Sequence, residues 1–193
     1  MLYLTVGTDK ITDELFVSIK DKEDMYKPSG GLWLTKYDTN YSNYNVWVDY
    51  LIDNPNVMFY KNKSASIWHQ PCSIVKLHDE ANIFNLNNEN NYNYLLNKYP
   101  LNNNSFSYES MTKDYDGIYV DLLSLITNSN KKEISDLVKQ YCVSTLLLYN
   151  LDCIDYYHSG LLDIEPFDLE YYMYEGTSYN INYDKIKKKI KMK

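Results

Sequence analysis

Short runs of apolar residues, separated by polar turns, predict that much of this chain forms strands of a sheet. The first run, LYLTV, ends at Gly7, and in KPSGGLWLT the turn residues at 28–31 lead into a second aromatic run. The run at residues 142–149 fits a buried strand or more helix, and its β-branched start favours a strand. Strands are expected at residues 2–6, 15–19, 32–35, 73–77, 83–86, 118–120, 142–149 and 153–157, with a turn at Ser159 and Gly160.

Other segments carry the three- and four-residue apolar spacing of a helix. A short helix is expected at residues 107–111. A longer one follows Asn130, which resembles the start of a capping box with Glu133 three residues on. The apolar faces comprise Val46, Trp47, Tyr50 and Leu51 in one helix, and Ile134, Leu137, Val138 and Tyr141 in the longer one.

Strands and helices interleave without a regular βαβ period, which predicts an α+β fold with a mixed or antiparallel sheet and flanking helices. The asparagine-dense stretch that ends at Asn104 is expected to be a mobile surface loop. We expect one globular domain at residues 1–182 and a lysine-rich tail at 183–193. The tail fits a solvated, frayed helix end, and an anionic partner or membrane surface is the alternative.

The charge of the chain narrows the classes of function. Its 193 residues carry a formal charge of −7, with a sequence pI near 4.9, which disfavours a general nucleic-acid binder. All 19 basic residues of the Lys+Arg total are lysine. Because only arginine offers a planar two-pronged donor for phosphate or carboxylate, any mechanism that needs a guanidinium is excluded.

The cysteines and the N-terminus predict a cytoplasmic protein. Cys72, Cys142 and Cys153 are odd in number and lack CxxC spacing, and residues 1–10 lack a basic segment followed by an apolar stretch. No apolar run reaches the length of about 18 residues that a membrane-spanning helix needs. We therefore expect reduced thiols and no membrane segment.

The common catalytic motifs are missing or weak. Gly30-Gly31 is followed by LWLT rather than a helix start, and neither GxGxxG nor the Walker loop occurs. His69 and Cys72, then His78 and Asp79, lack the paired spacings of a zinc site, so we expect no metal. Nothing beside the cysteines lowers a thiol pKa, which favours structural cysteines over a nucleophile.

Four segments occur in an order that resembles the ADP-ribosyltransferase-like superfamily: LYLTVG, GGLWLT, YDGIYV and DCIDYYHSGLLDI. More narrowly, KPSGGLWLT and LYNLDCID are similar to segments of small phage and bacterial proteins with a KPxGGLW strand. The resemblance implies an ADP-ribosyltransferase-like fold with NAD as substrate. It also implies transfer of ADP-ribose to a macromolecular target, with nicotinamide as the leaving group.

The resemblance assigns roles to individual residues. The family's aromatic-hydroxyl strand falls on Trp33 and Thr35 and is entered through Gly31, so that the indole would stack on nicotinamide or ribose and the hydroxyl would hold the neighbouring strand. The family's acidic position matches Asp155, which would stabilise the oxocarbenium-like centre, although it is one methylene shorter than the family's glutamate. From the residues alone, Trp33 as an ordinary core residue stays equally open.

The first strand departs from the family pattern. It should supply an arginine or histidine that orients the cofactor, and LYLTVGT has neither. Thr5, or the backbone near Gly7, would take that place by hydrogen bonding the carboxamide or a ribose. The arginine-dependent subclass is excluded because the chain has no arginine.

A second hypothesis is that the protein is not an enzyme. The acidic charge and the 22 tyrosines fit an inhibitor or decoy of phage or mobile-element origin that binds a host protein in the host cytoplasm. Tyrosine offers a large contact area at low entropic cost, and this reading needs many of the 22 to be exposed. The two readings differ in whether the protein binds NAD.

Overall fold

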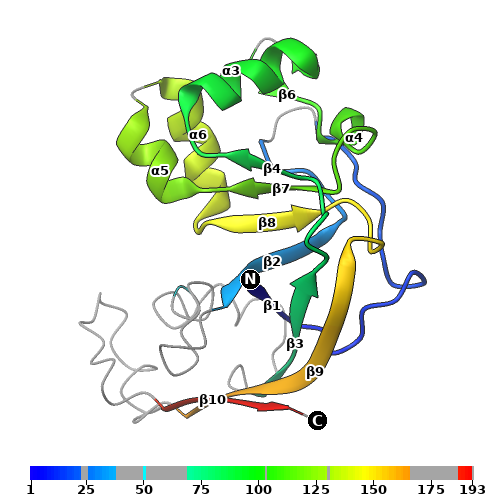
Figure 1. Ribbon diagram of the computed structural model, residues 1–193. Helices are drawn as coiled ribbons and strands as arrows, with labels where there is room; N and C mark the ends of the chain where they lie inside the picture. The colour runs from blue at the N-terminus through cyan, green and yellow to red at the C-terminus, as the bar shows by residue number, and fades with distance from the viewer. Residues whose placement is uncertain are drawn as a thin grey trace.

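An eight-stranded mixed sheet organises the protein, with strand order β10-β9-β3-β1-β2-β8-β7-β4 among the described residues (Figure 1). The computed structural model describes residues 1–22, 26–37, 50, 69–102, 104–129, 131–165 and 187–192. β4 and β7 run parallel, and the other neighbours are antiparallel. The strands are β1 (Leu2–Val6), β2 (Leu32–Tyr37), β3 (His69–Leu77), β4 (Ile83–Leu86), β7 (Gly117–Val120), β8 (Thr145–Leu148), β9 (Ile154–Glu165) and β10 (Lys187–Met192).

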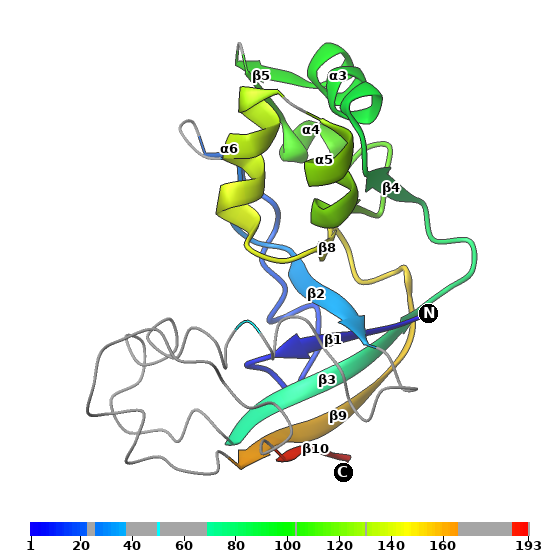
Figure 2. The same ribbon diagram turned by 90° about the vertical axis from the view of Figure 1, so that its left-hand side faces the viewer.

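The helices gather at the β8-β7-β4 end of the sheet, and β3, β9 and β10 form the other end (Figures 1 and 2). A small hairpin of β5 (Pro100–Asn102) and β6 (Ser105–Phe106) follows the first helix of this group. These elements establish an α+β fold. The helices are α3 (Glu89–Lys98), α4 (Tyr108–Met111), α5 (Leu122–Asn128) and α6 (Lys132–Tyr141).

At β8 the sheet is buried on both faces. All four of its residues are buried, and successive side chains of a strand point to opposite faces. Leu147 joins the large core beneath the helices, whereas Leu146 and Leu148 join a smaller core on the other face. The large core takes apolar residues from each helix, among them Tyr92, Leu95, Tyr108, Met111, Leu122, Leu125, Ile134, Leu137 and Tyr141.

The two ends of the sheet meet at β1 and β2. Their register comprises the pairs Leu2↔Tyr37, Tyr3↔Lys36 and Leu4↔Thr35. On its other side β1 pairs with β3 along its whole length, and β2 pairs with β8. The first strand of the chain therefore lies in the middle of the sheet.

Several predicted elements are confirmed. Strands lie at Leu2–Val6 and Ile83–Leu86 as expected, and the predicted strands at 32–35 and 73–77 form parts of β2 and β3. The run at 142–149 contains β8, and the short helix after Ser107 is α4, whose first turn the Ser107 hydroxyl caps. In the predicted helix at residues 46–51, only Tyr50 is a described residue, and it is helical; the rest lies outside the described part.

The asparagine-dense stretch was predicted wrongly as a loop. Residues 89–98 form α3, because the Asn88 side chain accepts a hydrogen bond from the backbone of Asn91 and caps the first turn. Tyr92 and Leu95 then fall three residues apart on the buried face. Helix α5, which the apolar spacing did not suggest, begins in the same way after Asp121.

Three further local predictions were wrong. Residues 15–19 form no strand, and only Lys20 beyond them makes an isolated bridge, to Ser29. Ser159 and Gly160 lie inside β9, paired with Ser73 and Cys72 of β3, so the predicted turn there is continuous strand. The N-cap of α6 is Lys131 rather than Asn130, and no side chain caps it.

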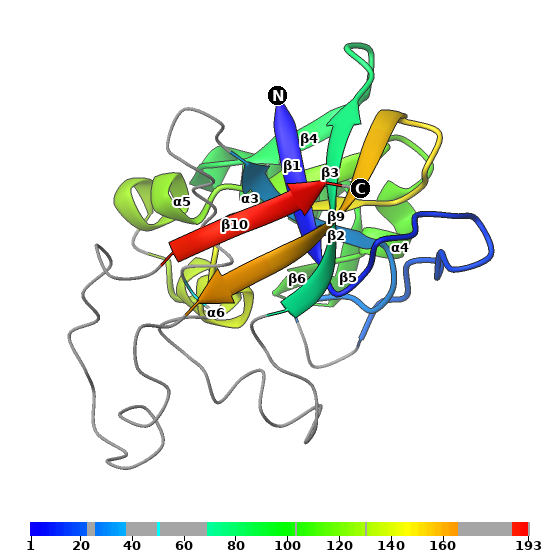
Figure 3. The same ribbon diagram turned by 90° about the horizontal axis from the view of Figure 1, so that it is seen from below.

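The lysine-rich segment at the end of the chain pairs as a strand. Residues 187–192, expected in a frayed helix end, form β10 antiparallel to β9. Figure 3 looks onto this end of the sheet and shows the two strands side by side. β9 is thus flanked by β10 and β3 and is not an edge strand among the described ones.

Candidate functional site

A pocket of about 580 Å³ opens beside the junction of β1 and β2. Its size lies within the usual range of small-molecule sites, which is about 300–1,000 Å³. The end of β1, the start of β2, the segment before β2 and the end of α6 supply its walls. The described lining residues are Leu4, Thr5, Val6, Gly7, Thr8, Lys22, Lys27, Pro28, Gly31, Leu32, Trp33, Leu34, Thr35, Tyr141 and Thr145.

Trp33 forms an aromatic wall of this pocket. Its Nε1 donates a hydrogen bond to the Gly30 carbonyl oxygen at 2.8 Å, which fixes the orientation of the indole. The Trp33 and Tyr141 rings lie 5.9 Å apart, and Lys27 Nζ lies 4.5 Å from the Trp33 ring centre. Lysine, tryptophan and tyrosine therefore meet in one cation–π cluster at the pocket.

The turn before β2 needs glycine for two physical reasons. Gly30 and Gly31 both have positive φ, at 78° and 69°, a conformation that L side chains rarely adopt. A Cβ on Gly31 would also lie 2.7 Å from the Leu148 carbonyl oxygen of β8. The Gly31 N–H donates instead to the Val17 carbonyl oxygen at 2.7 Å. This close packing fixes the position of the turn and therefore the position of Trp33, two residues after Gly31.

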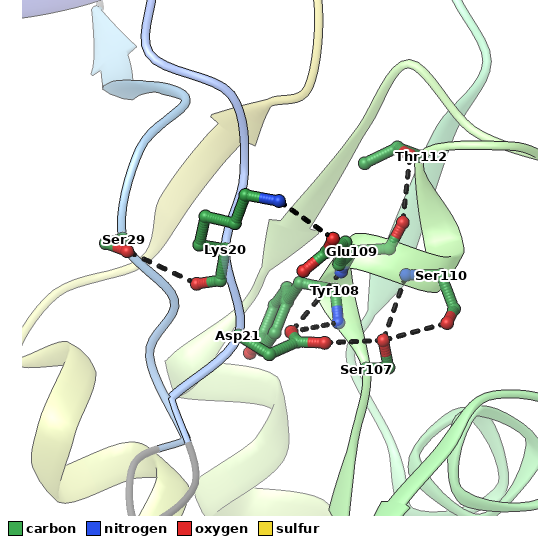
Figure 4. Close-up of polar contacts among 8 residues, drawn as sticks. All are labelled: Lys20, Asp21, Ser29, Ser107, Tyr108, Glu109, Ser110 and Thr112. Carbon is green, nitrogen blue, oxygen red and sulfur yellow. Dashed lines mark hydrogen bonds and ion pairs between the residues drawn. The ribbon is translucent and has the colours of Figure 1, made fainter.

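The segment that carries the two pocket lysines is fastened to α4 (Figure 4). Asp21 Oδ1 accepts hydrogen bonds from the backbone N–H groups of Tyr108, at 2.8 Å, and Glu109, at 3.3 Å. Asp21 Oδ2 accepts from the Ser107 hydroxyl. Lys20 adds an ion pair to Glu109 at 3.0 Å. These contacts place a carboxylate where α4 leaves backbone donors without helical partners.

The electrostatics of the pocket oppose those of the whole chain. Lys22 and Lys27 are its charged lining residues in the described part, and no described carboxylate borders it. Burial lowers the pKa of the Lys27 ammonium, and Lys22 lowers it further, although the Cys142 thiol acts in the opposite direction. In a protein of net charge −7, the described lining of this pocket is therefore cationic and aromatic, and it suits an anion with a planar ring.

The four predicted cofactor-binding residues, Thr5, Gly31, Trp33 and Thr35, all line this pocket. Leu4 is paired with Thr35, so Trp33 and Thr35 share a sheet face with Leu4. The Thr35 hydroxyl makes a long contact, 3.5 Å, with the Leu4 carbonyl oxygen across the two strands. Since side chains alternate along a strand, the Thr5 side chain lies on the opposite sheet face from that of Leu4.

Asp155, the predicted catalytic residue, is not brought to the described lining. Ile154, next to Asp155, pairs with Leu77 of β3, and the preceding residue of β3, Lys76, pairs with Leu2 at the start of β1. Asp155 therefore lies at the level of the start of β1. Leu4, two residues further along β1, pairs with Thr35, and Trp33 lies two residues before Thr35 in the antiparallel β2. At about 3.3 Å for each of these four residues, Trp33 lies roughly 13 Å further along the sheet.

The Asp155 carboxylate takes part in an ion pair at its own end of the sheet. Oδ2 lies 2.8 Å from Lys76 Nζ, and Oδ1 lies 3.8 Å from His78 Nδ1. The hydrogen bond from Lys76 holds the pKa of Asp155 below its usual value. The geometry gives this side chain a role in joining β9 to β3.

Lys22, Lys27 and Tyr141 were not among the candidate site residues predicted from the sequence, where Tyr141 was assigned to the apolar face of a helix. Lys27 is the first residue of KPSGG and Lys22 lies five positions before it, so the usable signal is that both precede the turn that leads into β2. Tyr141 lies 108 positions after Trp33, and only tertiary packing brings it to the site.

No group of three or more metal-ligating side chains occurs among the described residues. Burial raises the pKa of the Cys153 thiol to about 11. Cys72 is also buried, and Cys142 is the exposed cysteine. None of the helices in the described ranges is long and apolar enough to cross a membrane.

No protein-family model, curated protein or solved structure matches the chain.

Proposed function

We propose that the pocket binds NAD and that the protein is an ADP-ribosyltransferase-like enzyme that transfers ADP-ribose to a macromolecular target. The observation that carries the proposal is the convergence of Gly31, Trp33 and Thr35 with two lysines on one pocket that no described carboxylate borders. The resemblance between short sequence segments implies a cofactor-binding role for these three residues, and all three line the same pocket.

The chemistry of the pocket suits a dinucleotide. The Trp33 indole, held by its hydrogen bond to Gly30, offers a fixed face on which nicotinamide can stack. The lysines offer positive charge to the diphosphate. The mixture of apolar walls and a few placed polar groups is typical of small-molecule sites.

In the proposed reaction the bond between ribose C1′ and the nicotinamide nitrogen breaks, and neutral nicotinamide leaves with the bonding electron pair. A nucleophilic atom of the target then bonds to C1′ and loses its proton to solvent, and with water the product is free ADP-ribose. The described lining supports the binding of NAD. The transfer step is proposed on the resemblance, because Asp155 lies outside that lining.

The test is isothermal calorimetry with NAD on the full chain and on two variants. Trp33→Ala should weaken binding about tenfold or more, since it removes the stacking surface. Asp155→Ala should leave NAD binding unchanged, because the ion pair with Lys76 is remote from the pocket. Nicotinamide release, followed by chromatography with and without a cell lysate as acceptor, tests the transfer. Wild-type protein that binds no NAD would refute the proposal.

The alternative hypothesis of an inhibitor needs many exposed tyrosines, and the described residues show few of them. Five tyrosines are in the buried core of the described part: Tyr92, Tyr99, Tyr108, Tyr141 and Tyr149. Among the exposed large hydrophobics of that part the tyrosines are Tyr94, Tyr156 and Tyr157. Of the 14 tyrosines in the described part, five therefore belong to the core.

A further inference from the structure

The cationic side chains of the pocket come from a single short segment. Lys22 and Lys27 both precede the turn that begins β2, and both line the pocket with Trp33. The chain has no arginine, so lysine is the only side chain of permanent positive charge available for an anionic ligand. Lys22 and Lys27 are therefore the groups of the described lining that could bind an anionic ligand in this acidic protein.

This segment is fixed on both sides of the two lysines. Lys20 and Ser29 exchange backbone hydrogen bonds, at 3.0 and 2.9 Å, which closes its base. Asp21, next to Lys22, is bound to the first turn of α4 (Figure 4).

Contacts at Tyr26 fix the other end, next to Lys27. The Tyr26 N–H donates to Gln140 Oε1 at 2.9 Å, and the Tyr26 carbonyl oxygen accepts from the Tyr108 hydroxyl at 2.8 Å. The backbone beside each lysine is therefore preorganised, and little ordering remains to oppose binding.

The lysines have no carboxylate partner among the described residues. Lys27 is half-buried, with its ammonium 4.5 Å from the Trp33 ring centre and 5.6 Å from that of Tyr141. Lys22 is exposed at the rim. Contacts with aromatic faces compensate a half-buried ammonium incompletely, and an anionic oxygen within reach would complete its coordination.

We propose that Lys22 and Lys27 form a diphosphate-binding pair, which takes the place of the cation that the first strand lacks. The inference rests on the proposed function, since it assigns the part of NAD that these residues hold. Nicotinamide stacks on Trp33 while the diphosphate lies against the two ammonium groups. The pair contributes point charges rather than a bidentate fork, so binding depends on ionic strength more than on phosphate orientation.

Calorimetry on the full chain tests the pair with ligands that differ in the diphosphate. NAD and ADP-ribose carry it, and nicotinamide riboside and adenosine do not. Lys27→Met and Lys22→Met should each weaken NAD and ADP-ribose about tenfold and leave the two nucleosides within about twofold. Lys27→Arg should retain most of the affinity, and Lys113→Met, an exposed lysine outside the lining, is the matched control.

The outcomes separate this inference from the proposed function. NAD that binds wild type and both methionine variants equally would overturn the lysine pair and leave NAD binding intact. Equal losses for nucleosides and diphosphates in Lys27→Met would show that the variant disturbs Trp33, and would also overturn the assignment. Wild type that binds none of the ligands would refute both proposals. Losses confined to the diphosphate ligands, with a weaker salt dependence than wild type, would support the pair.

Discussion

Two buried tyrosine hydroxyls should differ in their contribution to stability although they bond to each other. Tyr108 and Tyr141 are 3% and 1% exposed, and their oxygens lie 2.7 Å apart. Tyr108 donates its one hydroxyl proton to the Tyr26 carbonyl oxygen at 2.8 Å. Tyr141 must therefore donate in the bond between the two hydroxyls. Removing the Tyr108 oxygen leaves a donor and an acceptor without partners, whereas removing the Tyr141 oxygen leaves the Tyr108 donor satisfied.

The two phenylalanine variants follow from this order of donors. Tyr141→Phe loses one hydrogen bond, a cost of about 1 kcal/mol in the free energy of unfolding. Tyr108→Phe loses the bond to the Tyr26 carbonyl oxygen at a similar cost of about 1 kcal/mol, and it strands the Tyr141 hydroxyl as a buried donor at a further cost of about 1–3 kcal/mol. The expected total is about 2–4 kcal/mol. Both variants keep the ring, so cavity terms do not differ between them.

Urea unfolding followed by far-UV circular dichroism measures the difference. At a slope of about 2 kcal/mol per molar urea, the midpoint should fall by about 0.5 M in Tyr141→Phe and by about 1–2 M in Tyr108→Phe. Tyr157→Phe, at an exposed position, is the control and should move the midpoint little. Equal losses in the two buried variants, or a larger loss in Tyr141→Phe, would refute the assigned direction of the hydrogen bonds.

Three other predictions concern stability and reactivity. Gly31→Ala should lower the free energy of unfolding by about 2 kcal/mol more than Gly7→Ala in urea titrations, because both glycines have positive φ but only a Cβ at position 31 meets neighbouring atoms; equal losses would contradict this. In native protein a chromogenic disulfide reagent should modify Cys142 and spare the two buried thiols, and Cys142→Ser should abolish the fast reaction. A hydrogen bond from the Tyr99 hydroxyl and, as a smaller effect, one from the Lys98 ammonium hold the pKa of Asp114 below its usual 3.8. The ionised carboxylate therefore stabilises the fold at neutral pH, and this stabilisation is lost as the pH falls through the lowered pKa. Thermal melts should therefore show a smaller loss of stability in acid for Asp114→Asn than for wild type.

The sequence was sufficient for elements whose signal is local. The strand at residues 2–6 combines β-branched and aromatic residues with a closing glycine, and α6 carries four apolar residues on one face. The turn at Gly30 and Gly31 located β2, and with it three residues of the candidate site. These features depend on a few neighbouring positions and on the conformational freedom of glycine.

The remaining features depend on partners distant in the chain. Helix α3 was not predicted because its sequence is rich in asparagine, which is typical of loops, although Asn88 in fact caps the helix. Ser159 and Gly160 have the composition of a turn, yet pairing with β3 keeps them extended. Asp155 matched a motif position, but the register of β9 against β3 decides where its side chain lies. Register and order of strands are set by the whole sheet, and no single segment encodes them.

The narrow junction between β1 and β2 also bears on how the protein opens. Among the described strands, three residue pairs of β1 and β2 connect the backbones of the wing of β3, β9 and β10 and the helix-covered wing of β8, β7 and β4. The smaller core adds side-chain packing between the wings, where Val75 of β3 meets Leu146 and Leu148 of β8. Few hydrogen bonds must break for the wings to part, so in amide hydrogen exchange they would behave as two cooperative units with the junction as the weaker contact. The pocket borders both strands of that junction. A ligand bound there would raise the free energy of opening, and slower amide hydrogen exchange in β1 and β2 would be the first sign of its binding.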